Sequence, residues 1–193
     1  MKTYSKAEIE KIGNAIVFFA ERINDLSKTK LLKLIYLTEE MFVSRHNIPM
    51  FGLEFDIWQA GPVSRDIYID LSDEQPSLFS SFITTESDEK ATYIKPISKF
   101  SDDEFSDNEL QILDIVVDKF GSMTAKKLVD YTHRKTSLWF QIAKEKGLLE
   151  YFEHGYTNSS DEKIDFTRLL DKPGIEAYKE QVYFKELVSS INC

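Results

Sequence analysis

The chain has 193 residues, of which 42% are hydrophobic and 13% aromatic, and its formal net charge at pH 7 is −9. This composition excludes disorder as the default state, and the negative charge excludes a globally attractive field for nucleic acid or anionic lipid. The single cysteine, Cys193, excludes an intramolecular disulfide and a thiolate metal site, which favours a reducing cytoplasm.

Residues 6–23 are predicted to form an amphipathic helix. Their apolar side chains recur at alternating intervals of three and four residues, the spacing of one helical face: Ile9, Ile12, Ile16, Phe19 and Ile23. Ser5 and Glu8 fit a capping box, in which each side chain accepts a hydrogen bond from the other residue's free backbone N–H. The sequence therefore predicts where this helix starts as well as which face it buries.

A second helix is predicted to begin after Ser27 and to form the centre of the core. From Leu31 to Val43 its apolar residues cover most of the helix circumference, which indicates burial on several sides.

The chain lacks the apolar core of a signal peptide at its start, and its longest uncharged apolar run, Ala15–Ala20, is far below the ~20 residues of a membrane span. We therefore expect a soluble, cytoplasmic protein without a membrane partner.

Two short strands are predicted next, over residues 53–58 and 92–97. The first alternates apolar and polar side chains, and Gly61-Pro62 is expected to end it. Residues 63–71 are expected to form a short helix, and the polar stretch 84–90 leads to the second strand, whose Pro96 indicates an edge or a strand end. We expect the two strands to pair in one small antiparallel sheet.

Helices are predicted over about 107–120, 124–132, 136–145 and 174–191. The first three are short, are separated by tight turns and resemble a helix-turn-helix unit. The fold class is therefore a mainly α (α+β) one: a helical domain around a central buried helix, with a small antiparallel β-sheet. We expect residues 1–193 to form a single domain with a natural seam near residue 100.

Charge is distributed unevenly along the chain. Residues 84–118 are strongly acidic, whereas residues 122–147 hold six lysines and arginines against two acids. This basic segment fits a solvated helical face, which is the commoner meaning of such a run. It also fits phosphate contact by a helix-turn-helix or the docking of an acidic partner, and the sequence leaves these alternatives open.

The sequence carries no catalytic or metal-binding motif. No nucleophile elbow, phosphate loop or dinucleotide-binding turn occurs. The three histidines, His46, His133 and His154, do not follow metal-ligand spacing, and His46 and His133 lie at predicted helix ends, where an imidazolium interacts favourably with the helix dipole. We expect a protein that is not an enzyme and that holds no metal or cofactor, although a site assembled from distant residues stays an alternative.

Both tryptophans are candidates for a partner-binding site, because large aromatic side chains either fill a core or anchor a partner. Core filling is favoured for Trp139, whereas Trp58 shares its predicted strand with Glu54 and Asp56 and is expected to be exposed. The segment from Trp58 to Arg65 thus combines an aromatic residue, a rigid turn and a cation. The alternative is that Gly61-Pro62 only ends the strand and that Trp58 packs on the second helix.

Several motifs resemble the Panacea domain of SocA-like antitoxins, a family also found in phage-associated proteins. They are Thr29–Tyr36, Pro49, Glu54–Val63 with its Trp-x-x-Gly-Pro-Val element, and Tyr68. The second half agrees through Leu128, Thr132-His133, Ser137, Trp139 and Ile164. The resemblance spans about residues 10–170.

The resemblance implies a bacterial antitoxin, tied to a mobile element, that binds a toxin encoded beside it. In one branch of the family the antitoxin also acts as an adaptor that delivers the toxin to a protease, which makes a cytoplasmic protease a second expected partner. The partner-binding residues are then expected to be Trp58, Gly61, Pro62, Arg65, His133 and Trp139.

The alternative function is a DNA-binding regulator of a mobile element or prophage that uses residues 107–147 as a helix-turn-helix. A recognition helix needs cations that contact the phosphates and bases. The candidate helix, Thr136–Ala143, carries no charge and is followed only by Lys144 and Lys146. This favours protein binding over nucleic-acid binding.

Overall fold

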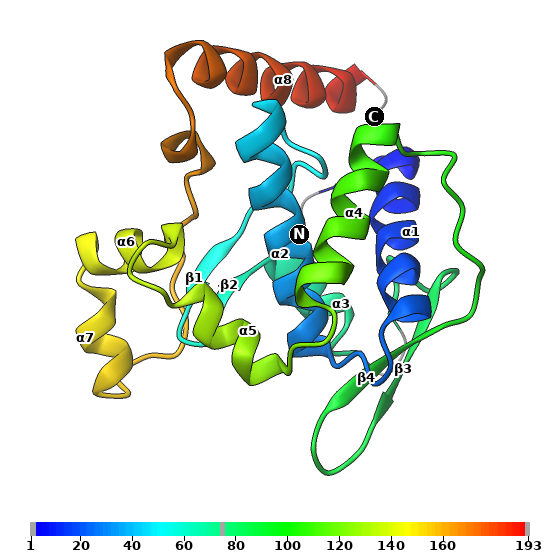
Figure 1. Cartoon of the computed structure of the whole chain (residues 1–193), viewed down its shortest axis with the longest axis horizontal. Helices are drawn as coiled ribbons and strands as arrows, with labels where there is room; N and C mark the ends of the chain where they lie inside the picture. Colours follow the sequence, from blue (N-terminus) through cyan, green and yellow to red (C-terminus); the bar gives the residue numbers. More distant parts are fainter. Residues whose placement is uncertain (1–2, 74–75, 192–193) are drawn as a thin grey trace.

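The computed structural model describes residues 3–73 and 76–191 and is mainly helical (Figure 1). The helices are α1 (Lys6–Arg22), α2 (Lys28–His46), α3 (Arg65–Asp70), α4 (Asp107–Phe120), α5 (Ala125–Thr132), α6 (Leu138–Glu145), α7 (Leu148–Glu153) and α8 (Lys172–Ile191). A single 3-10 turn, η1 (Phe166–Leu169), precedes α8. The strands are β1 (Asp56–Trp58), β2 (Gly61–Val63), β3 (Ile83–Ser87) and β4 (Thr92–Pro96). The mainly α (α+β) class predicted from the sequence is confirmed.

The start of α1 is fixed by the capping box that the sequence predicts. The Glu8 backbone N–H donates to the Ser5 hydroxyl at 3.2 Å, and the Ser5 backbone N–H donates to Glu8 Oε2 at 2.8 Å. Two of the backbone donors that a helix start leaves free are thereby satisfied. The predicted first helix is confirmed to within one residue at its C-terminal end.

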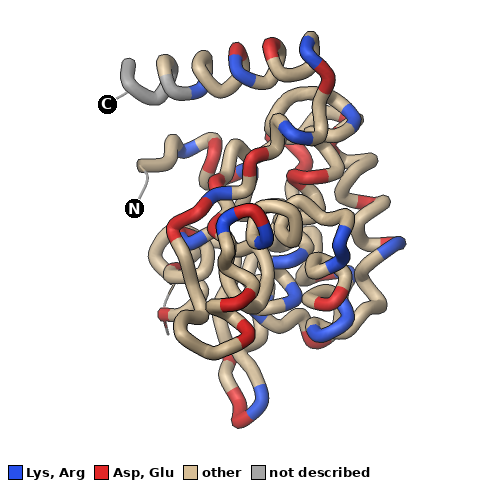
Figure 2. Tube along the Cα trace, turned by 90° about the vertical axis from the view of Figure 1, so that its left-hand side faces the viewer, with Lys and Arg blue, Asp and Glu red and all other residues tan. Residues whose placement is uncertain are grey.

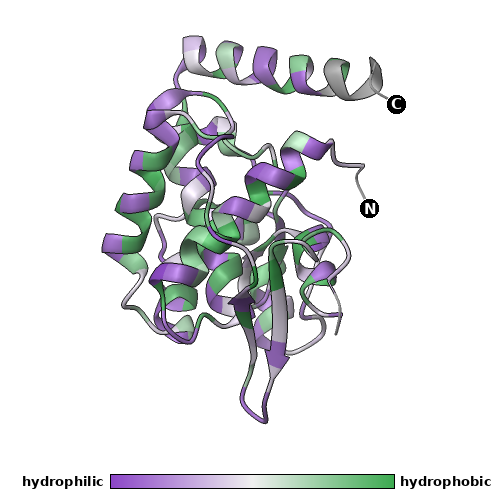
Figure 3. Cartoon of the chain, turned by 90° about the vertical axis from the view of Figure 1, so that its right-hand side faces the viewer, coloured by the Kyte–Doolittle hydropathy of each residue, from purple (hydrophilic) through white to green (hydrophobic). Residues whose placement is uncertain are grey.

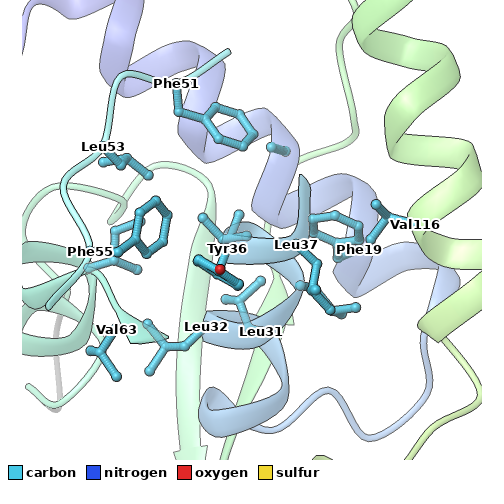
Figure 4. Close-up of a cluster of buried hydrophobic side chains, with 14 of the residues drawn as sticks. Phe19, Leu31, Leu32, Tyr36, Leu37, Phe51, Leu53, Phe55, Val63 and Val116 are labelled. Atoms are coloured by element: carbon cyan, nitrogen blue, oxygen red, sulfur yellow. The ribbon is translucent and has the colours of Figure 1, made fainter. Parts of the chain in front are cut away.

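Helix α2 is the centre of the core, as its all-round apolar sequence predicts. It packs against α1, α3, α4, α5, β2, β4 and η1, so it contacts elements from both sides of residue 100. Figure 4 shows Tyr36 among side chains that come from several elements, and its ring meets the Phe55 ring edge to face at 5.3 Å. In the same view Val63 of β2 lies beside Leu32 of α2. The first β-hairpin therefore packs directly against the central helix.

The predicted pairing of residues 53–58 with 92–97 is wrong. Strand β1 pairs antiparallel with β2, and β3 pairs antiparallel with β4, which gives two separate two-stranded sheets. In the first hairpin only Gln59 and Ala60 separate the paired residues, and such a short loop closes at a small entropic cost. Gly61-Pro62 therefore does not end a strand but opens the second one. The polar stretch 84–90 contains most of β3, whose outer end is exposed.

The C-terminal half wraps around the first hairpin and ends in a helix that lies across the top of the molecule in Figure 1. The predicted helices at 107–120, 124–132, 136–145 and 174–191 are present with shifts of up to two residues. Helix α7 is not among the predicted elements, because it has six residues and follows Gly147, whose φ of +70° breaks the preceding helix. Residues 158–164 then run along β1, where the Ile57 N–H donates to the Glu162 carbonyl at 2.9 Å.

Within residues 3–73 and 76–191, no helix combines the length and apolar composition that a bilayer span requires. Cys193, on which the prediction of no disulfide rests, lies outside the described residues.

Candidate functional site

The β1–β2 hairpin needs glycine at position 61. The φ angle of Gly61 is +99°, a backbone conformation that residues other than glycine rarely adopt. A Cβ at this position would lie 2.8 Å from the Thr132 hydroxyl oxygen and 3.0 Å from Lys33 Cε. Both the backbone conformation and the close approach of α2 and α5 therefore require a glycine here.

Below the hairpin lies a buried lysine. Lys33 of α2 is 1% exposed, and its Nζ donates to the Pro62 carbonyl at 2.9 Å. Burial lowers the pKa of Lys33 from 10.5 to about 7, because the charged ammonium loses its hydration. This hydrogen bond joins the hairpin to the central helix at a position that is shielded from solvent. The sequence prediction missed this residue, although a lysine on an all-round apolar helix is itself a signal.

The tip of the hairpin is held by the junction between α5 and α6. The Trp139 indole Nε1 donates to the Trp58 carbonyl at 2.9 Å, and His133 Nε2 lies 2.9 Å from the Gln59 carbonyl. The His133 and Trp139 rings meet edge to face with centroids 3.8 Å apart. Trp139 is 3% exposed, so it fills the core, as the sequence predicts. These two side chains fix the backbone of the tip.

Trp58 is half-buried and not exposed as the sequence predicts, because its ring packs on α3, which is not the second helix of the alternative prediction. Its ring packs against the Tyr68 ring of α3 at a centroid distance of 4.9 Å and an interplanar angle of 70°. Its indole Nε1 is shielded from solvent and has no hydrogen-bond partner among the described residues. A shielded N–H without an acceptor is rare, because it forgoes the hydrogen bond that water would supply in the unfolded chain. Trp58 therefore holds a donor that the fold leaves unused.

Arg65 connects the hairpin to the C-terminal half. Its Nε donates to Asp56 Oδ2 at 2.8 Å, and its Nη2 also contacts Asp161. The hydrogen bond to Asp161 and the charge of Asp56 raise the pKa of Arg65 above its ordinary value. The Asp56 carboxylate is 1% exposed and also binds Lys163, so two cations neutralise it. A cavity of about 220 Å³ with Tyr4 among its lining residues opens beside this network.

The structure brings the six predicted site residues together from β1, β2, α3 and the α5–α6 junction. Gly61, Pro62 and Trp139 are buried, whereas Trp58 and His133 are half-buried and Arg65 is exposed. The buried three position the hairpin, and the other three reach the surface. Asp56, Lys33 and Asp161 complete the arrangement and were not among the predicted residues, since spacing in the sequence does not reveal contacts between distant segments.

Three of the six cations in the basic segment 122–147 contact other groups of the protein. Lys126 pairs with Asp130 at 2.9 Å, Lys146 pairs with Glu162 at 3.0 Å, and the Arg134 guanidinium stacks on the Tyr131 ring. In the view of Figure 2, lysines and arginines lie among aspartates and glutamates. This arrangement is typical of a solvated helical surface.

A family model described as "Antitoxin SocA-like, Panacea domain" matches residues 31–140. The match begins in α2, contains both hairpins and ends within α6, so it covers all six predicted site residues. No curated protein and no solved structure matches the chain.

Proposed function

The chain belongs to the family of SocA-like antitoxins with a Panacea domain, and from this premise we propose that it neutralises a cognate toxin by binding it directly. The observation that carries the proposal is Trp58, a half-buried tryptophan at the edge of a hairpin whose tip Trp139 and His133 hold in place. We define the hairpin surface as the exposed and half-buried residues Trp58, Gln59, Ala60 and His133 at the tip, together with the exposed Arg65 at the open end of the hairpin. Interface hot spots are enriched in tryptophan, tyrosine and arginine.

Exposed aromatic residues adjoin the hairpin surface. The Gln59 side-chain amide donates to the Phe152 carbonyl at 2.8 Å, which places the tip against α7. Tyr151 on α7 is 55% exposed and Tyr156 in the following turn is 74% exposed, and their rings lie 6.0 Å apart. These tyrosines extend the apolar area that a protein partner could cover.

The geometry of α6 favours protein binding over the alternative function, DNA binding. Its face formed by Leu138, Trp139 and Ile142 is buried in the core. Of its exposed residues, Glu145 forms an ion pair with Arg168 at 2.7 Å, so neither side chain is left as a free cation for a phosphate. The helix offers Lys144 as its exposed cation, which is little for a recognition helix.

The proposal is tested by co-expressing this chain with the product of the neighbouring reading frame. We expect growth to be restored and the two proteins to co-purify. Trp58→Ala and Arg65→Ala should each weaken binding by at least ~1–2 kcal/mol while the protein stays folded. The matched control is Tyr183→Ala, which removes an exposed aromatic residue on α8 and should leave binding unchanged. Normal binding by both hairpin variants would contradict the site, and the segment Lys126–Lys146 would become the next candidate.

Neutralisation by binding is stoichiometric. Toxin activity should fall in proportion to added antitoxin and vanish near one equivalent, whereas full protection at a small fraction of one equivalent would contradict the proposal. A more specific version of this proposal is that the chain also delivers the bound toxin to a protease. It predicts that the toxin's half-life in cells shortens when this chain is present, and that deleting the protease restores the toxin level.

A further inference from the structure

A second cavity lies between α2, the end of α4, α5, the start of α6 and η1. Its volume is about 270 Å³, and its apolar wall includes Leu37, Met41, Phe120 and Leu169. None of the six predicted site residues lines it. The volume is below the roughly 300–1,000 Å³ of sites for drug-sized ligands, so the cavity accommodates one group of about the size of a single amino acid.

Two arginines line this cavity and leave donors unused. Arg134 stacks on the Tyr131 ring, with its guanidinium carbon 3.3 Å from the ring centroid, and its Nε donates to the Tyr131 carbonyl at 2.8 Å. Its two terminal nitrogens have no hydrogen-bond partner in the part of the chain that the structure describes, and Arg45 makes no ion pair there. Guanidinium groups bind carboxylates and phosphates through paired hydrogen bonds.

One carboxylate also lines the cavity. Glu40 Oε1 accepts a hydrogen bond of 2.6 Å from the hydroxyl of Tyr36, which belongs to the core. Burial raises the pKa of Glu40 above its ordinary value, and the Tyr36 hydrogen bond and the charge of Arg134 oppose this change. With one carboxylate and two arginines, the lining is net positive on a chain of net charge −9. The cavity therefore favours an anion that also brings an N–H donor for Glu40.

We propose that this cavity binds an α-carboxylate flanked by an apolar side chain, the group that a free apolar amino acid and the C-terminus of a polypeptide share. The carboxylate binds Arg45 and Arg134, the side chain packs against the apolar wall, and the adjacent nitrogen donates to Glu40. This inference does not depend on toxin binding by the hairpin surface, because the two sites share no residue.

The test is a nuclear magnetic resonance titration of the full-length, isotope-labelled chain with four probes: leucine, N-acetyl-leucine, N-acetyl-leucine amide and inorganic phosphate. Binding of leucine or N-acetyl-leucine, with the amide at least about tenfold weaker, supports the proposal, because the amide lacks the charge that the arginines recognise. Preference for leucine identifies a free amino acid, and binding of N-acetyl-leucine identifies a polypeptide C-terminus. Equal binding of the amide, binding of phosphate alone or no binding overturns the proposal.

Variants locate the site. Arg45→Gln and Arg134→Gln should each weaken the binding of the better probe by roughly tenfold or more, since each removes a charge-assisted contact. The matched control is Lys135→Gln, which removes an exposed cation next to Arg134 that does not line the cavity. Because Arg134 also stacks on Tyr131, the exposed Arg45 is the decisive position, and circular dichroism checks the fold. Unchanged binding by Arg45→Gln, or an equal loss in the control, contradicts the assignment.

Discussion

The two β-hairpins have the same antiparallel pairing but are held in different ways. The β1–β2 hairpin is buried along most of its length and receives side-chain hydrogen bonds from Lys33, Trp139 and Arg65, which come from three other elements. The β3–β4 hairpin is anchored near one end, where Ile83 and Ile94 are buried. Its other end projects from the body of the molecule and is hydrophilic at the tip (Figure 3).

This difference shows that the pairing of two strands and the positioning of the hairpin on the rest of the fold contribute separately to stability. The β3–β4 hairpin is held by its ladder, by two buried apolar side chains and by the backbone, where the Ile94 N–H donates to the Leu26 carbonyl at 2.9 Å. In β1–β2 the burial of polar groups requires partners supplied by the rest of the fold. We therefore expect substitutions at the contacts of β1–β2 to change stability far more than substitutions on β3–β4.

The largest effect is expected from pH at Lys33. Below pH 7 its ammonium is charged in both the folded and the unfolded chain, so the full cost of burying the charge is present. Between about pH 7 and 10.5 the unfolded chain binds more protons than the folded one, so the free energy of unfolding should rise by up to ~1.4 kcal/mol per pH unit. Lys33→Met should flatten this rise, as measured by urea unfolding across that range.

The control for this prediction lies on the other hairpin. Lys95→Met removes a half-exposed lysine from β4 and tests the effect of losing one lysine alone. If the difference between wild type and Lys33→Met does not vary with pH, Lys33 does not lose its proton within the folded protein.

A smaller effect is expected from Gly61→Ala. The added Cβ meets Thr132 and Lys33 at a φ of +99°, and we expect destabilisation of about 2–4 kcal/mol from overpacking and backbone strain. Gly155→Ala is the matched control, since Gly155 also has a positive φ, of +67°, but no atom lies within 4 Å of its Cβ position. It should cost roughly 1–2 kcal/mol. Equal losses in thermal unfolding would show that the close approach to α2 and α5 is unimportant.

Substitution of each tryptophan by phenylalanine should change the free energy of unfolding by different amounts. Trp139→Phe removes the donor to the Trp58 carbonyl and should cost about 1–3 kcal/mol. Trp58→Phe removes an indole N–H that has no partner among the described residues, so its cost should be within about 1 kcal/mol. Denaturant unfolding of both variants measures the difference, and a larger loss for Trp58→Phe would contradict the hydrogen-bond assignment.

The smallest effect is expected on β3–β4. Thr92→Ala removes a hydroxyl that lies 2.9 Å from the Ser87 hydroxyl at the exposed end of the ladder. We expect a loss of about 0.5 kcal/mol or less, because water replaces this contact. A loss comparable to that of Trp139→Phe would show that the second hairpin is held as firmly as the first.

Much of the helical fold is predictable from the sequence, because its signals are local. The capping box of Ser5 and Glu8 and the apolar spacing after it predict α1, and the all-round apolar stretch from Leu31 to Val43 predicts the central position of α2. The six candidate site residues combine a family motif with residue types typical of interfaces, and their role in binding stays a prediction. Which of them reach the surface could not be predicted, since burial depends on neighbours that are distant in the sequence.

The sequence by itself determined most of the helices, the buried faces of α1 and α2, and the family, because each follows from residues close together in the chain. Only the tertiary structure decided which strands pair and how the first hairpin is held. The contacts of Lys33 with Pro62, Trp58 with Trp139, and Asp56 with Lys163 span 29, 81 and 107 residues. Periodicity carries no information on such pairs. They form because packing removes these polar groups from water, and a buried donor or acceptor is stable only where the fold supplies its partner.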